Sequence, residues 1–208
     1  MSGLFVTFEG GEGAGKTTQI ELLAAALRAE GRAVLCTREP GGDPVAEAIR
    51  AVLLHRDEPI GHRTETLLFV AARAQVVDRV IRPALLSGAI VLCDRYADST
   101  VVYQGHARGL PLDDVRRLNA FATGGLAPDL TLLLDQDPEI GLARQPDRNR
   151  MESEDLAFHS RVREGYLAEA RADPGRYRVL DASRSASEVH AEVLAAVRAC
   201  LSSRGDAS

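Results

Sequence analysis

The chain has 208 residues, 45% of them hydrophobic, and a formal net charge of −5, which fits one compact domain with a full core. The acidic balance and the dispersal of the arginines argue against nucleic acid as the main partner, and no apolar run of about 18 residues could span a membrane. The three cysteines are few and far apart, as expected for a cytoplasmic protein with reduced thiols.

Strand-like and helix-like segments alternate along the chain, which indicates parallel strands joined by helices. The expected strands are almost continuously apolar, as is typical of strands covered on both faces. We therefore predict an α/β fold with a five-stranded parallel sheet and helices on both faces, formed by residues 1–201, with a disordered tail at 202–208. The expected strands are 4–8, 33–37, 89–93, 130–134 and 177–180, and the expected helices are 15–30, 43–55, 63–86, 112–123, 152–172 and 185–201.

The turn after the first expected strand matches the P-loop pattern G-x-x-x-x-G-K-[ST] at every fixed position of residues 10–17. An expected helix follows, so the context is the one that the motif needs, and it disfavours a chance glycine-rich turn. Lys16, the only lysine of the chain, would neutralise phosphates, and the Thr17 hydroxyl would ligate Mg²⁺. The motif predicts a P-loop NTPase fold that binds a nucleoside triphosphate. The expected nucleotide-binding residues are Gly10, Gly11, Glu12, Gly13, Ala14, Gly15, Lys16, Thr17 and Thr18.

Polar residues follow several expected strands, at the sheet edge where ligands of such folds bind. Asp94 and Arg95 follow the third strand, where the carboxylate could hold Mg²⁺ and the arginine could reach a second phosphate. A strand-end ion pair is the alternative. Asp135 ends the fourth strand and is either a second acid of this kind or a helix N-cap. The roles of Glu9 and Asp135 stay open at this point.

Two further segments carry arginines in suggestive places. Phe69 and Arg73 are four residues apart in an expected helix, so they share one face, which suits stacking on a base and gripping its edge. An aromatic residue at such a position is also typical of a core. Residues 143–150 place three arginines around Pro146. This segment is either an exposed basic loop or a lid, at about 143–152, that brings an arginine onto a transferred phosphoryl group.

These motifs, in this order, resemble those of the bacterial thymidylate kinases (dTMP kinases) along the chain to about residue 200. The matching segments are 8–18, 37–42, 68–75, 94–96, 103–105 and 148–152. The resemblance implies a single nucleoside monophosphate kinase-like domain with a short basic lid. It implies an enzyme that transfers the γ-phosphoryl group of ATP, with Mg²⁺ as cofactor, to dTMP, and it implies a homodimer.

The resemblance also implies a role for each matching residue of a base site. Thymine would stack on Phe69, while Arg73, Thr100 and Gln104 would read its polar edges. Tyr103 would crowd the place of a ribose 2′-hydroxyl.

At the phosphates, the resemblance implies that Arg38 and Arg95 clamp dTMP and that Glu12 lies near its 3′-hydroxyl. Thr17 and Asp94 would hold the metal. Some members carry an arginine directly after the P-loop acid, where this chain has Gly13, so the charge for catalysis would come from the lid. The expected catalytic residues are Lys16, Glu12, Arg95, Arg148 and Arg150, with Arg148 favoured on the phosphoryl group and Arg150 on the adenine.

Two other functions remain open from the sequence. A kinase of another pyrimidine nucleotide or of a deoxynucleoside is possible, because the 5-methyl group of thymine offers only about 1–3 kcal/mol of discrimination. A P-loop ATPase switch is more remote, since it leaves the acceptor-site arginines without a purpose. ADP formation without an acceptor would distinguish the switch from the kinases.

Overall fold

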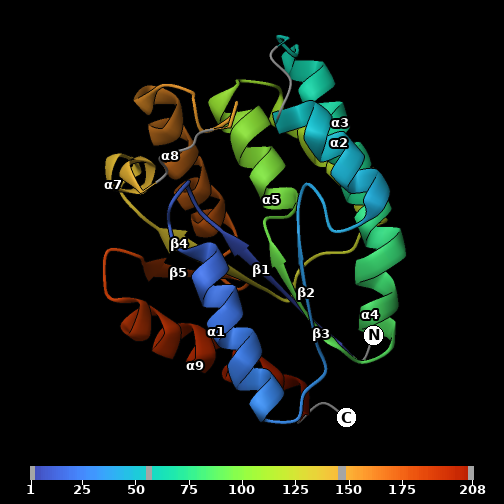
Figure 1. Cartoon of the computed structure of the whole chain (residues 1–208), viewed down its shortest axis with the longest axis vertical. Helices are drawn as coiled ribbons and strands as arrows, with labels where there is room; N and C mark the ends of the chain where they lie inside the picture. The colour runs from blue at the N-terminus through green and yellow to red at the C-terminus, as the bar shows by residue number, and fades with distance from the viewer. Residues whose placement is uncertain (1–2, 55–57, 145–148, 206–208) are drawn as a thin grey trace.

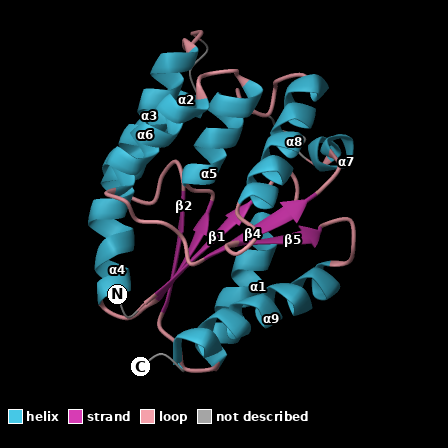
Figure 2. Ribbon diagram, turned by 180° about the vertical axis from the view of Figure 1, so that it is seen from behind, coloured by secondary structure: helices cyan, strands magenta, loops and turns pink. Residues whose placement is uncertain are grey.

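The computed structural model describes residues 3–54, 58–144 and 149–205. At its centre is a five-stranded parallel sheet in the order β2-β3-β1-β4-β5, with helices on both faces (Figures 1 and 2). This confirms the predicted fold, and each strand lies within one residue of its predicted bounds. The strands are β1 (Leu4–Glu9), β2 (Val34–Arg38), β3 (Ile90–Asp94), β4 (Leu130–Asp135) and β5 (Tyr177–Asp181).

The helices follow the predicted alternation with several additions. The longer ones are α1 (Lys16–Ala29), α2 (Pro44–Leu54), α3 (His62–Val76), α6 (Leu112–Thr123), α8 (Leu156–Ala172) and α9 (Ala186–Gly205). The shorter ones are α4 (Arg82–Leu86), α5 (Ala97–Thr100) and α7 (Pro138–Ala143), with π-helical turns η1 (Val77–Ile81) after α3 and η2 (Val101–Ala107) after α5.

The residues of β1 show how helices cover both faces of the sheet. All six of its residues are buried. Val6 and Phe8 pack in one cluster with apolar side chains of α1 and α9, whereas Phe5 packs in another with α3, η1 and α4. This alternation places helices on opposite faces (Figure 1). The central strand, and hence the P-loop that follows it, is therefore held from both sides.

The helical segment 97–107 was not predicted from the sequence. It is buried at almost every position, so it shows no amphipathic period, and Val101, Val102 and Gly105 favour a helix only weakly. Tertiary packing against α8 and α6 imposes the helix instead.

One short helix and two helix boundaries also differ from the predictions. α7 has six residues, which are too few for an amphipathic period to be recognised in the sequence. The helix expected at 152–172 begins at Leu156, because the Asp155 side chain caps it by accepting a bond from the Phe158 N–H at 2.6 Å. α9 continues through Gly205, so the predicted helix end at residue 201 is too early. Among the described residues, no helix is long and apolar enough to cross a membrane.

Candidate active site

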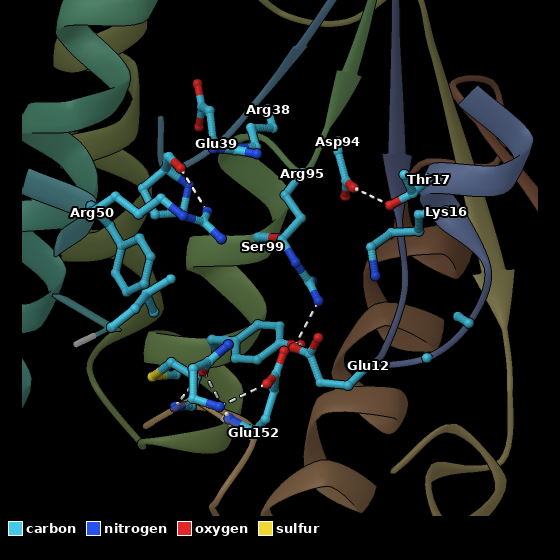
Figure 3. A pocket seen from close by; sticks show the side chains of 18 of the residues that line it. Glu12, Lys16, Thr17, Arg38, Glu39, Arg50, Asp94, Arg95, Ser99 and Glu152 are labelled. Atoms are coloured by element: carbon cyan, nitrogen blue, oxygen red, sulfur yellow. Dashed lines mark hydrogen bonds and ion pairs between the residues drawn. The ribbon is translucent and has the colours of Figure 1, made fainter. Parts of the chain in front are cut away.

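A cavity of about 530 Å³ opens at the carboxyl ends of the central strands, between the P-loop, α3 and η2 (Figure 3). It collects most of the site predicted from the sequence. The predicted residues that line it are Glu12, Gly13, Ala14, Gly15, Lys16, Thr17, Thr18, Arg38, Phe69, Arg73, Asp94, Arg95, Thr100, Tyr103 and Gln104. Two predicted residues at the start of the P-loop, Gly10 and Gly11, lie behind this lining and contribute backbone carbonyls.

The P-loop owes its shape to glycines in left-handed conformations. Gly13 has φ 64° and Gly15 has φ 89°, a region that side chains disfavour. A Cβ atom on Gly13 would also lie 2.0 Å from the Gly141 carbonyl oxygen of α7. Within the loop, Lys16 Nζ donates to the carbonyls of Gly10 and Gly11 at 3.2 and 2.8 Å. These two bonds hold the ammonium group against the backbone of the loop, and burial lowers the pKa of Lys16.

Thr17 and Asp94, the two predicted metal ligands, contact each other. The Thr17 hydroxyl donates to Asp94 Oδ2 at 3.4 Å (Figure 3). Hydroxyl and carboxylate oxygens are hard donors that fit Mg²⁺. Among the described residues, no group of three or more acidic, histidine or cysteine side chains could hold a metal ion. A magnesium ion here would therefore take its remaining ligands from phosphates and water.

Arg95 and Glu12 form the centre of the cavity (Figure 3). Arg95 follows β3 with φ 67°, and its Nη2 lies 2.7 Å from Glu12 Oε1. The same carboxylate oxygen accepts a hydrogen bond of 2.7 Å from the Tyr103 hydroxyl. Burial would raise the pKa of Glu12, but the charges of Arg95 and Lys16 lower it to about 2. Glu12 is therefore ionised, and its ion pair with Arg95 fixes the position of the guanidinium.

Glu9 lies beneath this pair and does not line the cavity. Its Oε2, the Ser99 hydroxyl and the Tyr166 hydroxyl are 2.6 to 2.8 Å from one another. Three such contacts need three protons, and the two hydroxyls supply only two. A protonated Glu9 would supply the third, and burial, followed by the charge of Asp98, raises the pKa of Glu9 to about 7.

This ring of hydrogen bonds shows where Glu9 lies, whose role the sequence left open. Tyr166 accepts a further bond of 3.1 Å from Arg95 Nη1, so Glu9 supports Arg95 from below. A carboxyl in that place has no access to a substrate hydroxyl. Tyr166 itself was not predicted, since a tyrosine in α8 gives no signal of its own.

Arg73 organises the part of the cavity next to α3. This side chain is 2% exposed, and its Nε donates to Glu39 Oε2 at 2.7 Å. Its Nη1 donates to Thr100 Oγ1 at 2.9 Å and to Asn119 Oδ1, and its Nη2 donates to the Tyr96 carbonyl. Four of its five N–H groups are used, which leaves one Nη2–H for a ligand.

The arginines that line the cavity include one that the sequence missed. Arg38 is predicted and lines the cavity, with an ion pair of 3.1 Å to Glu47. Arg50 of α2 lines the cavity as well, and its Nη1 donates to the Pro40 carbonyl at 2.8 Å. Burial lowers the pKa of Arg50, and so does the charge of Arg38. In the sequence Arg50 reads as an ordinary helix surface residue.

The basic segment is only partly brought to the cavity. Arg150 does not line it: its Nε donates to the Leu53 carbonyl at 2.9 Å and its Nη2 lies 2.6 Å from Glu65 Oε2. Arg148 lies outside the described residues. Arg144, which was not assigned a role, lines the cavity and donates to the Gly13 carbonyl at 3.1 Å.

Asp135 does not line the cavity and does not cap a helix. It forms an ion pair of 2.6 Å with Arg163 of α8. The cap of α7 is Asp137, whose side chain accepts from the Glu139 N–H at 2.9 Å. The interpretation of Asp135 as a helix cap was therefore wrong.

Comparisons with known proteins agree with this geometry. The family model described as thymidylate kinase matches residues 8–193. A thymidylate kinase of Deinococcus radiodurans is 55% identical over 203 residues, which cover 94% of this chain and 96% of the relative. One of Shouchella clausii is 50% identical and covers 98% and 99%. The crystal structure of thymidylate kinase from Ehrlichia chaffeensis superimposes with a TM-score of 0.78 at 32% identity, covering 95% of this chain and 99% of that one.

Proposed function

This chain belongs to the thymidylate kinase family and transfers the γ-phosphoryl group of ATP to dTMP, and we propose that the transfer takes place in the cavity between the P-loop and α3. One observation supports the place above all. Lys16 Nζ and Arg95 Nη1 both donate to the carbonyl of Gly10, at 3.2 and 3.0 Å. The cation that binds the donor phosphates and the cation that binds the acceptor phosphate are thus held at one backbone oxygen.

On the donor side, the backbone N–H groups of residues 10–18 and the start of α1 bind the ATP phosphates. Lys16 leaves its carbonyl partners for the phosphate oxygens. Thr17 and Asp94 hold Mg²⁺, which supplies neutralisation of the phosphate charge when it is bound. The residues of the chain fix where that charge is neutralised.

On the acceptor side, Arg95 binds the phosphate of dTMP with help from Arg38 and Arg50, which line the same end of the cavity. The acceptor phosphate is already an anionic nucleophile, so the reaction requires no general base. Catalysis then consists of aligning two anions that repel each other. Glu12, held ionised against Arg95, lies next to the place of the sugar 3′-hydroxyl.

At the base, Phe69 stacks on the thymine ring while the last N–H of Arg73 reaches its edge. Thr100 and Gln104 read the remaining polar edge, and Tyr103 occupies the space of a 2′-hydroxyl. A deoxynucleoside acceptor would need a general base. Glu9 is not available for that role, because its carboxyl group bonds to Ser99 and Tyr166.

The cation for the transferred phosphoryl group comes from the basic segment after α7. We assign this role to Arg148, as the family resemblance implies. Arg144 contributes from the side of Gly13, whose carbonyl it already contacts. A role for Arg150 at the adenine requires that it leave Glu65.

The quaternary structure and location follow the family. We assign a homodimer, because Leu67 of α3 and Phe121 of α6 are 53% and 86% exposed on two helices that pack together. A cytoplasmic location fits Cys36 and Cys93, neither of which forms a disulfide within the described part of the chain.

A panel of acceptors tests the proposed function. Coupled ADP release is measured with Mg-ATP and dTMP, dUMP, dCMP, AMP, thymidine or no acceptor. We expect a strong rate with dTMP, a weaker one with dUMP and a negligible one without an acceptor. Equal ADP release with and without acceptors would contradict the proposal and leave an ATPase.

A further inference from the structure

Glu65 is a buried acid at the start of α3 for which the reaction described so far has no use. Its side chain is 0% exposed, and it does not line the cavity. It lies four residues before Phe69 and eight before Arg73, so the three share one face of the helix. The base site therefore continues along α3 to a carboxylate that the ligand does not reach.

The contacts of Glu65 join the base site to its surroundings. Its Oε1 accepts from Gln104 Nε2 at 3.0 Å and from Arg108 Nε at 3.3 Å. Its Oε2 lies 2.6 Å from Arg150 Nη2. Burial would raise the pKa of Glu65, but the bond from Gln104 and the charge of Arg108 hold it below its usual value. The group is thus ionised, and an ionised carboxylate only accepts hydrogen bonds.

This chemistry fixes the amide of Gln104, which is 1% exposed and lines the cavity. Nε2 is the only end of the amide that can donate to Glu65, so it turns toward the carboxylate. The end left for a ligand is Oε1, an acceptor. Thymine presents an N–H donor at its N3 position, whereas cytosine presents an acceptor there.

We propose that Glu65 is a positioning residue for base selection, which turns the Gln104 carbonyl toward the base and so favours thymine over cytosine. This inference rests on the proposed role of Gln104 at the base edge. Glu65 acts only through Gln104, and the two arginines keep it charged without contacting the base. A base with an acceptor at N3 would face the carbonyl oxygen directly and lose its hydrogen bond.

The test compares two variants of this residue in the full-length protein. In Glu65→Gln, the new amide can either accept from Gln104 or donate to it, so the orientation of Gln104 is no longer fixed. Glu65→Asp keeps the charge for Arg108 and Arg150 but withdraws the oxygen from Gln104 by one methylene group. Circular dichroism identifies the variants that fold, and the second variant serves if the first does not.

The matched control is Glu154→Gln. Glu154 also accepts from Arg108, at 2.6 Å, but has no contact with Gln104. The Glu154→Gln substitution removes one negative charge from the same cluster, so it reports any general effect of disturbing the arginines.

The readout is the ratio of kcat/KM for dTMP to that for dCMP, together with the Kd of each nucleotide by calorimetry. We expect the ratio to fall about tenfold in the Glu65 variants and to stay within about twofold in the control. A ratio that is unchanged in the folded Glu65 variants, or that falls equally in the control, would overturn the inference. Failure of the proposed function shows separately, as a wild-type protein that binds dTMP without phosphorylating it or does not bind it.

Discussion

Arg95 and Tyr103 converge on one atom: each donates a 2.7 Å hydrogen bond to Oε1 of Glu12. The guanidinium also lies over the tyrosine ring, 5.1 Å from its centre. Charge, ring and carboxylate therefore fix the direction of the arginine before any substrate arrives. Such preorganisation is what electrostatic catalysis requires, because the charge need not be reoriented during the reaction.

Replacing Arg95 separates its charge from its backbone strain. Both Arg95→Ala and Arg95→Gly should lower kcat/KM for dTMP by about 10²–10³, as for the loss of a preorganised charge. Glycine tolerates the φ of 67° and alanine does not, so the glycine variant should be more stable by about 1 kcal/mol. Steady-state kinetics and urea unfolding measure the two effects. Equal free energies of unfolding for the two variants would show that the φ of Arg95 carries no strain.

Lys16 should not tolerate arginine. The compact ammonium donates to two loop carbonyls, whereas a guanidinium is a wide planar fork. We expect Lys16→Arg, like Lys16→Ala, to lower kcat by about 10²-fold or more. Thermal unfolding checks that both variants remain folded. An arginine variant within fivefold of wild type would show that position 16 needs only a charge.

Glu9 should make stability fall as pH rises. The pKa of its carboxyl is about 7 in the folded protein against an ordinary value of 4.5. Between these values the folded state binds the proton and the unfolded state does not, so unfolding free energy decreases with pH, by about 3 kcal/mol in total. Glu9→Gln imitates the neutral acid and should lack this decrease.

Urea unfolding from pH 4.5 to 8 measures the difference between wild type and Glu9→Gln. The exposed Glu21→Gln in α1 is the matched control and should follow the wild-type curve. Parallel curves for wild type and Glu9→Gln would show that Glu9 is ionised in the fold.

Thr17 should determine how much magnesium the enzyme needs. In Thr17→Ala the hydroxyl that bonds to Asp94 is lost, so the metal keeps one protein ligand fewer. The Mg²⁺ concentration for half-maximal rate at fixed ATP should rise by about tenfold, the size of one lost charge-assisted bond. Chelation with EDTA should abolish activity in both proteins. An unchanged magnesium curve would remove Thr17 from the site.

Phe121 should hold two copies of the chain together. Phe121→Glu places a charge on the most exposed large apolar side chain of α6, which is 86% exposed. Sedimentation should show a dimer for wild type and a monomer for the variant. Leu86→Glu is the control, because Leu86 is also exposed, at 64%, but lies on α4. A wild-type monomer at micromolar concentrations would contradict the proposed homodimer.

The sheet was predictable because its strands are buried on both faces and read as continuous apolar runs. The P-loop was predictable because its residues are contiguous. Arg50, Arg144 and Tyr166 were not predictable, since packing between segments far apart in the chain brings the two arginines to the cavity and Tyr166 to Arg95. Arg150 was placed by its motif, but its partner Glu65 comes from α3 and holds it away from the cavity. Contacts of this kind have no period in the sequence.

The contact between the P-loop and α7 limits how this protein could change over evolutionary time. A Cβ at Gly13 would meet the Gly141 carbonyl, and a Cβ at Gly141 would meet the Glu12 carbonyl at 2.1 Å. Neither glycine can therefore gain a side chain alone. An ancestor or descendant with a P-loop arginine at position 13 would have to move α7 in the same step. The two glycines thus exclude a side chain, and with it a charge, at position 13 unless α7 moves.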